Sequence, residues 1–574
     1  MRNTCVRILK RDILVFLLDG NSITIPFLSI YRYEFLLMID SSLGFEVFRR
    51  RTRMKEEEEA IAILVNVPVT EEERETDVLN SSCNENEVTS VRHWSEVVCS
   101  PWEFVKSFLQ WFAVMREAFG GPFLGVVMVV YGVSQGYAET MKRLATNYYW
   151  RDVQKMQPAS TQVLMALSTI PWDIKPIYGL ITDTFPIAGY RRWPYLAICG
   201  IIGCLCLWAL SFFELVPWMA TLLMAGVAMC TAFPDVVTDA TVAQQSKTIP
   251  KFASDLQSLS WGSMAVGGLF GCGVSGAAVH ELGPQSSYLL VSIAPLMLIV
   301  AALALPESRS PKTVLRIQFG ALMHTLRLFG KTLRDPTLWR PALYIYLSQG
   351  SLCPDISEAM FFWLTDPEAG PGFSEEFMGF VNAVGYLAMF IGIVGYNHWF
   401  RCQTFRKMFL WSQVTSSFIG LLDIIIVCRM NLRMHIPDRA FVLGDQALTD
   451  AISKIQLMPM LVLSSQLCPI GIEGTVFAFL MSVSNFGSTS GTWLGALLLK
   501  WLHIQRDDYS RLWLAVLIRS LMRLSPLFFI FLVPDCTVEN IRPLNISLTN
   551  DLELEESTKD IMPFNKVSVH ELDE

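Results

Sequence analysis

Charged residues are scarce in this 574-residue sequence, and the scarcity is uneven. Asp, Glu, Lys and Arg make up 17% of the chain, whereas a soluble domain usually has about 25%. Hydrophobic residues make up 52%. The charges gather in the first 118 residues and beyond residue 534, in runs such as KEEEE at 55–59, EEERE at 71–75 and DLELEE at 551–556. This distribution predicts a membrane protein with polar ends.

Sequence motifs of catalysis are missing as well. The 13 cysteines are scattered, with no CxxC pair and no Cys/His cluster at zinc spacing, so they indicate small apolar packing residues. There is no GxSxG, HExxH or Walker-type loop. We therefore expect neither an enzyme nor an ATP-driven pump, and no cofactor or metal. No basic patch indicates binding to nucleic acid.

Long apolar runs take the place of the missing charge. A spanning helix needs about 20 mostly apolar residues, and about twelve segments qualify. They cover 119–138, 160–181, 193–215, 218–240, 257–279 and 286–305, then 341–364, 376–398, 406–428, 440–463, 471–500 and 512–533. A basic stretch over 306–340 separates the two sets. The predicted fold is all-α and polytopic, with pseudo-symmetric six-helix halves at 119–305 and 341–533, a layout that resembles the major facilitator transporters.

Lysine and arginine are concentrated on one side of the predicted bilayer. Arg191 and Arg192 follow the second span, and further basic residues lie in 306–340, whereas the connections after spans three, five and seven have almost none. The exceptions are Lys142, Arg143, Arg429, Arg433 and Arg506. Basic loops favour the cytoplasmic side, so we expect 306–340 and both termini there. The host membrane, plasma or organellar, stays open.

Short repeated motifs support an internal duplication, which is common in transporters. Ser134-Gln135-Gly136 in the first span matches Ser348-Gln349-Gly350 in the seventh. Thr238-Asp239-Ala240 in the fourth span matches Thr449-Asp450-Ala451 in the tenth. The pairs occur in the order that duplication of six helices requires. Gln135 and Gln349 are candidates for substrate contact or, alternatively, polar contacts between helices.

Ionisable residues inside the predicted spans are the main candidates for function. A charge near the midplane of the bilayer costs about 2.5–3.5 kcal/mol on insertion scales unless it is paired or faces a water-filled cavity. The candidates are Asp235 and Asp239 in the fourth span, Asp173 and Lys175 in the second, Asp355 in the seventh and Asp450 in the tenth. Two alternatives remain. Asp450 and Lys454 could neutralise each other four residues apart, and Asp239 and Lys175 could extend toward the interface.

The stretch from Trp172 to Arg192 suggests a gating loop. Gly179 and Asp183 are followed by Gly189 and the pair Arg191 and Arg192. The Asp183 carboxylate could accept backbone N–H groups at a helix start, and the arginines could bind carboxylate or lipid phosphate. Such contacts would hold one state and open in each cycle. The alternative is a solvated loop whose arginines only mark the inner side.

The same stretch resembles the signature of the folate–biopterin transporter family, a branch of the major facilitators. The matching runs are PWDIKPIYG at 171–179, PIAGYRRWPYL at 186–196, DVVTDA at 235–240 and PDISEAMFF at 354–362. The resemblance covers roughly 115–535. It implies alternating-access transport of folates or related pterins with proton coupling. The chain departs from the pattern at Gln244 and Gln245, where better-characterised plastid-type members have an acidic–basic pair.

Pterin chemistry gives the candidates roles. A carboxylate can accept both N–H donors on one edge of the ring, so Asp235 or Asp239 is expected to bind that edge or to carry the coupling proton. Lys175 is a candidate for an anionic tail or an internal ion pair. Two other classes remain open: a major-facilitator carrier of a different small polar organic solute, and a non-transporting membrane receptor or scaffold.

The ends of the chain carry separate predictions. Residues 1–100 are expected to be polar and disordered, with Met54 as a candidate translation start. Residues 101–118 have the apolar spacing of an interfacial amphipathic helix. Residues 534–574 are expected to form an acidic cytoplasmic tail.

Overall fold

The computed structural model describes residues 101–249, 252–307, 309, 323, 326–396, 403–468 and 473–537. The predictions for 1–100 with Met54, for most of 306–340 and for the tail beyond 537 lie outside the described residues. The chain divides into two compact units, Met1–Met115 and Arg116–Glu574. The described part of the first unit is the start of helix α4 (Pro101–Phe119), and the interfacial amphipathic helix expected at 101–118 stays a prediction.

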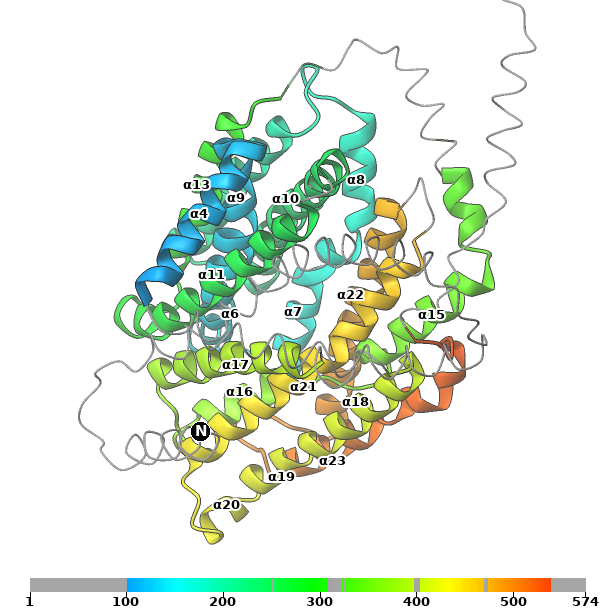
Figure 1. The fold of residues 1–574 in the computed structure, drawn as a ribbon. Coiled ribbons are helices and arrows are strands. Elements are labelled where there is room, and N and C mark those ends of the chain that lie inside the picture. Colours follow the sequence, from blue (N-terminus) through cyan, green and yellow to red (C-terminus); the bar gives the residue numbers. More distant parts are fainter. Residues whose placement is uncertain are drawn as a thin grey trace, which may run out of the picture. The chain divides into compact units, whose positions relative to one another are not determined.

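The described residues of the second unit form helices joined by short connections, with no strand, so the all-α prediction is confirmed (Figure 1). The first set of helices is α5 (Gly121–Val127), η1 (Met128–Ala138), α6 (Glu139–Tyr148), η2 (Tyr149–Val153), α7 (Pro158–Asp173), α8 (Lys175–Thr184), α9 (Trp193–Phe212), α10 (Pro217–Thr248), α11 (Ala253–Leu282), α12 (Ser287–Val291) and α13 (Ile293–Ala304).

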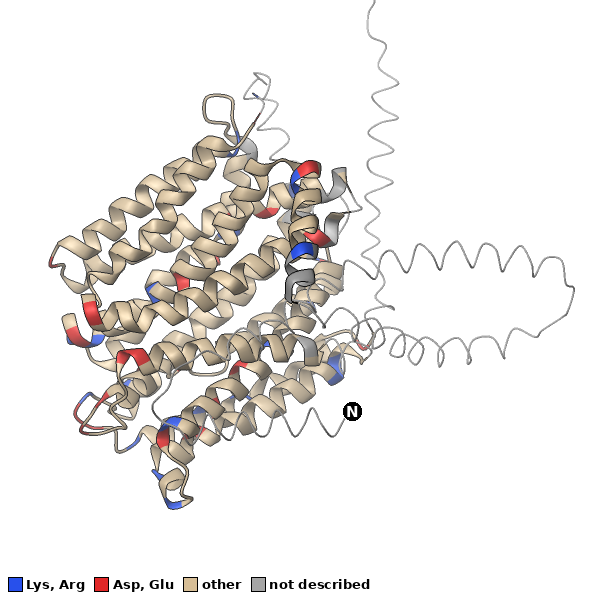
Figure 2. Ribbon diagram, turned by 60° about the vertical axis from the view of Figure 1, so that its left-hand side comes forward, with Lys and Arg blue, Asp and Glu red and all other residues tan. Residues whose placement is uncertain are grey.

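The second set continues in the same way to the end of the described chain. It comprises α15 (Pro336–Tyr346), η4 (Leu347–Ser351), α16 (Ser357–Thr365), α17 (Glu375–Gly395), α18 (Phe405–Gly420), α19 (Leu422–Val427), α20 (Met430–Arg433), α21 (Asp438–Gln466), α22 (Glu473–Trp501), α23 (Leu512–Met522) and η6 (Ser525–Leu532). Figure 2 shows that most of the described ribbon is tan, with few Lys, Arg, Asp and Glu.

Seven helices among the described residues are long and apolar enough to cross a membrane, and an eighth counts if the helices on either side of Gly120 form one span. The remaining predicted spans are also helical, but they are broken or more polar. The second breaks at Ile174, between α7 and α8, because Pro176 removes a helical hydrogen bond. The seventh breaks after Gly350, whose φ is +131°. Length and apolarity alone do not confirm twelve spans.

The predicted end of the first span at residue 138 is wrong. Helix continues from Gly121 to Val153, so Lys142 and Arg143 lie on α6 and not in a loop. Lys142 is neutralised by Glu139 one turn earlier, with 2.6 Å between Nζ and Oε2. A search for uninterrupted apolar residues stops at Glu139 and misses this continuation.

Glycines bring helices of corresponding order into close contact. η1 packs on α11, and η4 packs on α22. A Cβ at Gly136 would lie 2.5 Å from the Met264 carbonyl oxygen, and one at Gly491 would lie 2.8 Å from the Cys353 carbonyl oxygen. These are the contacts of the first segment with the fifth and of the seventh with the eleventh. The same pair of segments therefore packs through glycines in both sets, but the repeated glycines differ, since Gly350 has a φ of +131° and an added Cβ there would meet nothing nearer than 3.5 Å.

Two further helix pairs join the predicted halves. α7 packs on α22, and α11 packs on α17, and Figure 1 shows α22 alongside α7. Gly276 of α11 lies against the backbone of Glu376, where an added Cβ would lie 2.6 Å from its Cα. These contacts position the candidate residues of α8 and α10 beside the junction.

Candidate functional site

Two predicted residues, Lys175 and Gln135, contact a third, Asp235. The carboxylate of Asp235, on α10, is only 4% exposed. Lys175 Nζ, at the start of α8, lies 2.6 Å from its Oδ2, and Gln135 Nε2, on η1, donates to its Oδ1 at 2.6 Å. The Lys175 ammonium also lies 4.6 Å from the centroid of the Trp172 ring. The ammonium, the amide and the indole together stabilise a charge that burial alone would disfavour.

Asp239 lies one helical turn beyond Asp235 and has a different environment. The Tyr131 hydroxyl, on η1, donates to its Oδ1. Tyr131 is buried, whereas Asp239 is exposed. The first carboxylate is thus balanced by a cation, while the second belongs to an exposed residue and is bonded to a phenol. The sequence singled out both carboxylates but missed Tyr131, although Tyr131 and Gln135 are four residues apart on one helical face.

Asp173 takes part in the contact between α7 and α22. Thr489 Oγ1 donates to Asp173 Oδ1 at 3.3 Å, and Asn485 Nδ2 donates to the Trp172 carbonyl oxygen at 3.1 Å. These bonds hold the α7–α8 break, and with it Lys175, against the second set of helices. Asp173 therefore lies beside the Asp235 cluster without bonding to it.

The other predicted residues lie apart from this cluster. Asp355 accepts the Ser357 N–H at 3.0 Å at the start of α16 and Gln162 Nε2 at 3.1 Å, so it joins the first residue of α16 to α7. Asp450 accepts Gln446 Nε2 at 2.6 Å. Gln349 contributes its backbone carbonyl, which accepts from Ser488 at 3.1 Å.

The loop after α8 is fixed by Glu307, a residue that the sequence analysis missed. The backbone N–H groups of Arg191, Arg192 and Trp193 donate to the Glu307 carboxylate at 2.7, 3.1 and 3.1 Å. A carboxylate at the start of α9 also interacts favourably with the helix dipole. This is the role that we expected for Asp183, whose side chain lies outside the described residues. In the sequence, the signal for this acceptor was Glu307 itself, a single acidic residue at the end of the sixth apolar segment.

The rest of the predicted gating loop packs against α10. Gly189 has φ of +85°, which glycine adopts without strain. The Arg192 guanidinium donates to the Gln244 side-chain carbonyl. Gly179, on α8, faces Val236, whose Cγ1 would lie 3.4 Å from an added Cβ. The loop thus connects α8, α9, α10 and Glu307.

The opposite end of the bundle is closed by contacts between the two sets of helices. We call the residues 148–157, 361–365 and 502–509 the closed end. Arg151 Nη1 donates to the Thr365 carbonyl oxygen at 3.1 Å, and Arg506 Nη1 donates to the Arg151 carbonyl oxygen at 2.7 Å. The rings of Tyr148 and Phe361 lie edge to face at 5.0 Å. These contacts hold the two sets of helices together at this end.

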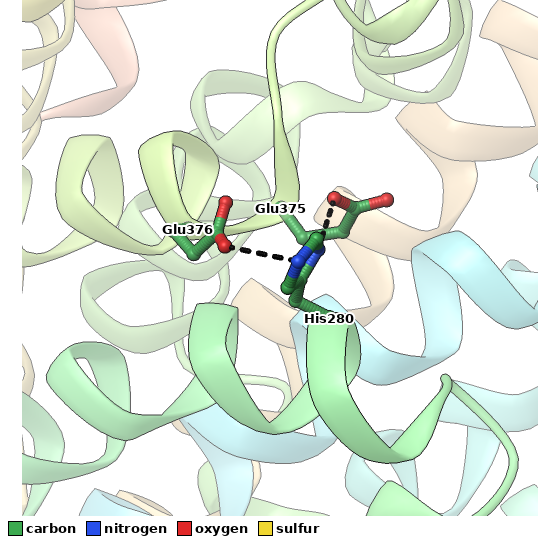
Figure 3. Close-up of side chains that lie close together, drawn as sticks. All are labelled: His280, Glu375 and Glu376. Atoms are coloured by element: carbon green, nitrogen blue, oxygen red, sulfur yellow. Dashed lines mark hydrogen bonds and ion pairs between the residues drawn. The ribbon is translucent and has the colours of Figure 1, made fainter.

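A histidine joins the two sets of helices where α11 ends and α17 begins. His280 Nδ1 lies 3.4 Å from Glu375 Oε2, and His280 Nε2 lies 3.4 Å from Glu376 Oε1. Figure 3 shows the ring between the two carboxylates, one facing each nitrogen. The three side chains are close enough to offer ligands to a metal ion. Sequence spacing missed this cluster because its members are 95 residues apart.

Comparison with known proteins identifies the family. The profile described as the BT1 family matches residues 135–547, more than half of the chain. The chain belongs to the BT1 family. This BT1-family chain is 39% identical over 432 residues to a probable folate-biopterin transporter of Arabidopsis thaliana, covering 74% of this chain and 85% of the relative. It is 33% identical over 401 residues to a folate-biopterin transporter of Synechocystis, covering 69% and 78%.

Solved structures confirm the fold of the BT1-family chain. A crystal structure of a variant of the nucleoside transporter NupG matches with a TM-score of 0.55 at 13% identity, over 72% of this chain and all of that one. An auto-inhibited peptide transporter of the POT family matches with a TM-score of 0.55 at 13% identity, over 74% and 98%. The fold is that of the major facilitators, and the chain is a multi-pass membrane transporter. The resemblance drawn from the sequence motifs is confirmed.

Proposed function

We propose that this protein is a secondary active carrier of folates or related pterins that works by alternating access with proton coupling. The observation that carries the proposal is the pair of carboxylates on α10, with Asp235 balanced by Lys175 and Asp239 exposed beside Tyr131. The relatives named folate-biopterin transporters supply the substrate class.

The two carboxylates have different roles in this proposal: Asp239 binds the substrate or the proton, and Asp235 positions the surrounding helices. Asp239 is accessible, so it can accept the paired N–H donors on the pterin edge or exchange a proton with solvent. Withdrawal of a carboxylate from water favours its neutral form, which couples binding of a substrate to proton uptake. Asp235 is already saturated by Lys175 and Gln135, so its role is to position η1, α8 and α10 around Asp239.

Alternating access is supported by the different packing of the two ends. The closed end joins the two sets of helices through Arg151, Thr365 and Arg506. At the other end, the contacts of Arg192 with Gln244 and Glu307 stay within the first set. In this proposal the contacts of the closed end break during the transport cycle. The end near Arg192 then closes, which gives the second of the two alternating states.

The deciding experiment is uptake of labelled folate, folinate and biopterin at two external pH values, by cells that lack their own folate carrier and express this chain. Saturable uptake that increases with external acidity and is lost in Asp239→Asn supports a proton-coupled pterin carrier. Absence of uptake despite protein at the cell surface would overturn it. Uptake of a different small polar solute would then support another cargo, and failure of all solutes would support a receptor or scaffold.

A further inference from the structure

Arg143 is a cation within the first helical segment that has no partner in the described part of the chain. It lies on α6, inside the continuous helix from Gly121 to Val153, and it is exposed. It forms no hydrogen bond and no ion pair with another described residue. Its neighbour Lys142, in contrast, is bonded to Glu139. An unpaired charge in such a segment is costly, and it marks a functional site.

Ionisable side chains on three helices of the second set lie near Arg143. It interacts electrostatically with Glu358 of α16 and Asp450 of α21, and also with Tyr386 of α17. Neither carboxylate is close enough to form an ion pair with it. Glu358 is 6% exposed, and its Oε2 has no hydrogen-bond partner among the described residues. The guanidinium thus faces a polar junction of the two sets whose hydrogen-bonding capacity is only partly used.

The position of Arg143 along its helix is also informative. Eight residues separate it from Gln135, which corresponds to about 12 Å along the helix axis. In the other direction, the closed end begins at Tyr148. Arg143 therefore lies between the Asp235–Asp239 cluster and the closed end.

We propose that Arg143 binds the carboxylate tail of the transported substrate while the Asp235–Asp239 cluster binds its pterin ring. This inference rests on the proposed function. A guanidinium matches a carboxylate with two parallel N–H donors. The sequence analysis left two roles open for Lys175, an anionic tail or an internal ion pair, and the structure shows the ion pair with Asp235. Lys175 is therefore occupied, whereas Arg143, on the continuous helix that also carries Tyr131 and Gln135, is a cation available for the tail.

The alternative role for Arg143 is to balance the charges of Glu358 and Asp450. The two roles differ in their dependence on the substrate. A tail-binding residue affects folate, which ends in a glutamate, and leaves biopterin, which has no carboxylate, unaffected. A counter-ion affects the carrier itself and hence both substrates equally.

The test is uptake of folate and biopterin by wild type, Arg143→Lys and Arg143→Gln, each corrected for protein at the cell surface. We expect Arg143→Gln to raise the KM for folate by about 10- to 100-fold, the loss of a charged hydrogen bond, with Arg143→Lys in between. The KM for biopterin should change by less than about twofold, which is well below the smallest change of about tenfold that we expect for folate.

Three outcomes would overturn the inference: equal loss of both substrates, unchanged folate uptake in Arg143→Gln, or a wild type that carries biopterin and not folate. If Arg143→Gln fails to reach the surface, Arg143→Gln/Glu358→Gln decides the matter. Recovery of both substrates shows a counter-ion role, and recovery of biopterin alone supports tail binding. A wild type that carries neither substrate overturns the proposed function itself, which keeps the two failures distinct.

Discussion

The ammonium of Lys175 lies 2.6 Å from the carboxylate of Asp235, across the contact between α8 and α10. The side chains are 14% and 6% exposed, so both charges depend on each other. Loss of one partner in a buried pair costs about 3–5 kcal/mol, because the other charge is left uncompensated. Neutral replacement of both partners avoids that cost.

We therefore expect Lys175→Gln to lower the thermal stability of the purified protein and to abolish transport. Lys175→Gln/Asp235→Asn should recover stability but not transport, because the ordered contact among η1, α8 and α10 is not restored. Melting temperature in detergent and uptake in cells measure the two effects. Equal stability of Lys175→Gln and wild type would contradict the mutual dependence of the pair.

Asp239 gives a prediction for pH dependence. Uptake by wild type should increase as external pH falls, because a protonated Asp239 enters the transport cycle in the proposed mechanism. Asp239→Asn should show low uptake that does not change between acidic and neutral pH. Tyr131→Phe is the matched control, since it removes the hydrogen bond and keeps the carboxylate, and it should keep the acid stimulation. Acid stimulation that survives in Asp239→Asn would assign the proton to another group.

The sequence could predict which residues of α10 and α8 matter, because charges in apolar segments stand out from their surroundings. It could not predict their partners. Lys175 and Asp235 are 60 residues apart and meet only after the α7–α8 break turns Lys175 toward α10. Tyr131 was missed because an aromatic residue in an apolar run gives no signal until a carboxylate is placed beside it.

The fold class was predictable from apolar segments and repeated motifs, while the helix bounds were less so. α6 stays helical past the first apolar run through the polar residues Glu139 and Lys142, so Arg143 could not be placed correctly from hydrophobicity. Glu307 was missed for a related reason. Its three N–H partners begin 116 residues earlier in the chain, and only the folded arrangement of α9 and α13 brings them together.

Glu307 gives a prediction for stability. Glu307→Ala leaves the N–H groups at the start of α9 without their acceptor, which costs about 1–3 kcal/mol. Glu307→Gln keeps one of the two oxygens that accept these N–H groups, and it also loses the interaction of its charge with the helix dipole, about 0.3–1 kcal/mol. Melting temperatures should therefore decrease from wild type to Glu307→Gln to Glu307→Ala. Glu214→Ala, at an exposed loop position, should match wild type, and a Glu307→Ala protein as stable as that control would refute the capping role.

The close helix contacts at Gly136 and Gly491 give the last prediction. A Cβ at either position would overlap a backbone carbonyl of the facing segment, Met264 or Cys353, and backbone cannot yield as a side-chain end can. Gly136→Ala and Gly491→Ala should each destabilise the protein by about 1–3 kcal/mol or more through overpacking.

The matched controls for these two glycines are Gly125→Ala and Gly444→Ala, where an added Cβ meets nothing within 4 Å. Alanine is the better helix former, so both controls should be as stable as wild type or slightly more stable. Melting temperature and surface expression distinguish the two groups. Because each glycine lies at the contact between the first and fifth segments of its set, both variants should be destabilised. A large effect at one and none at the other would show that the duplicated contact is used in only one set.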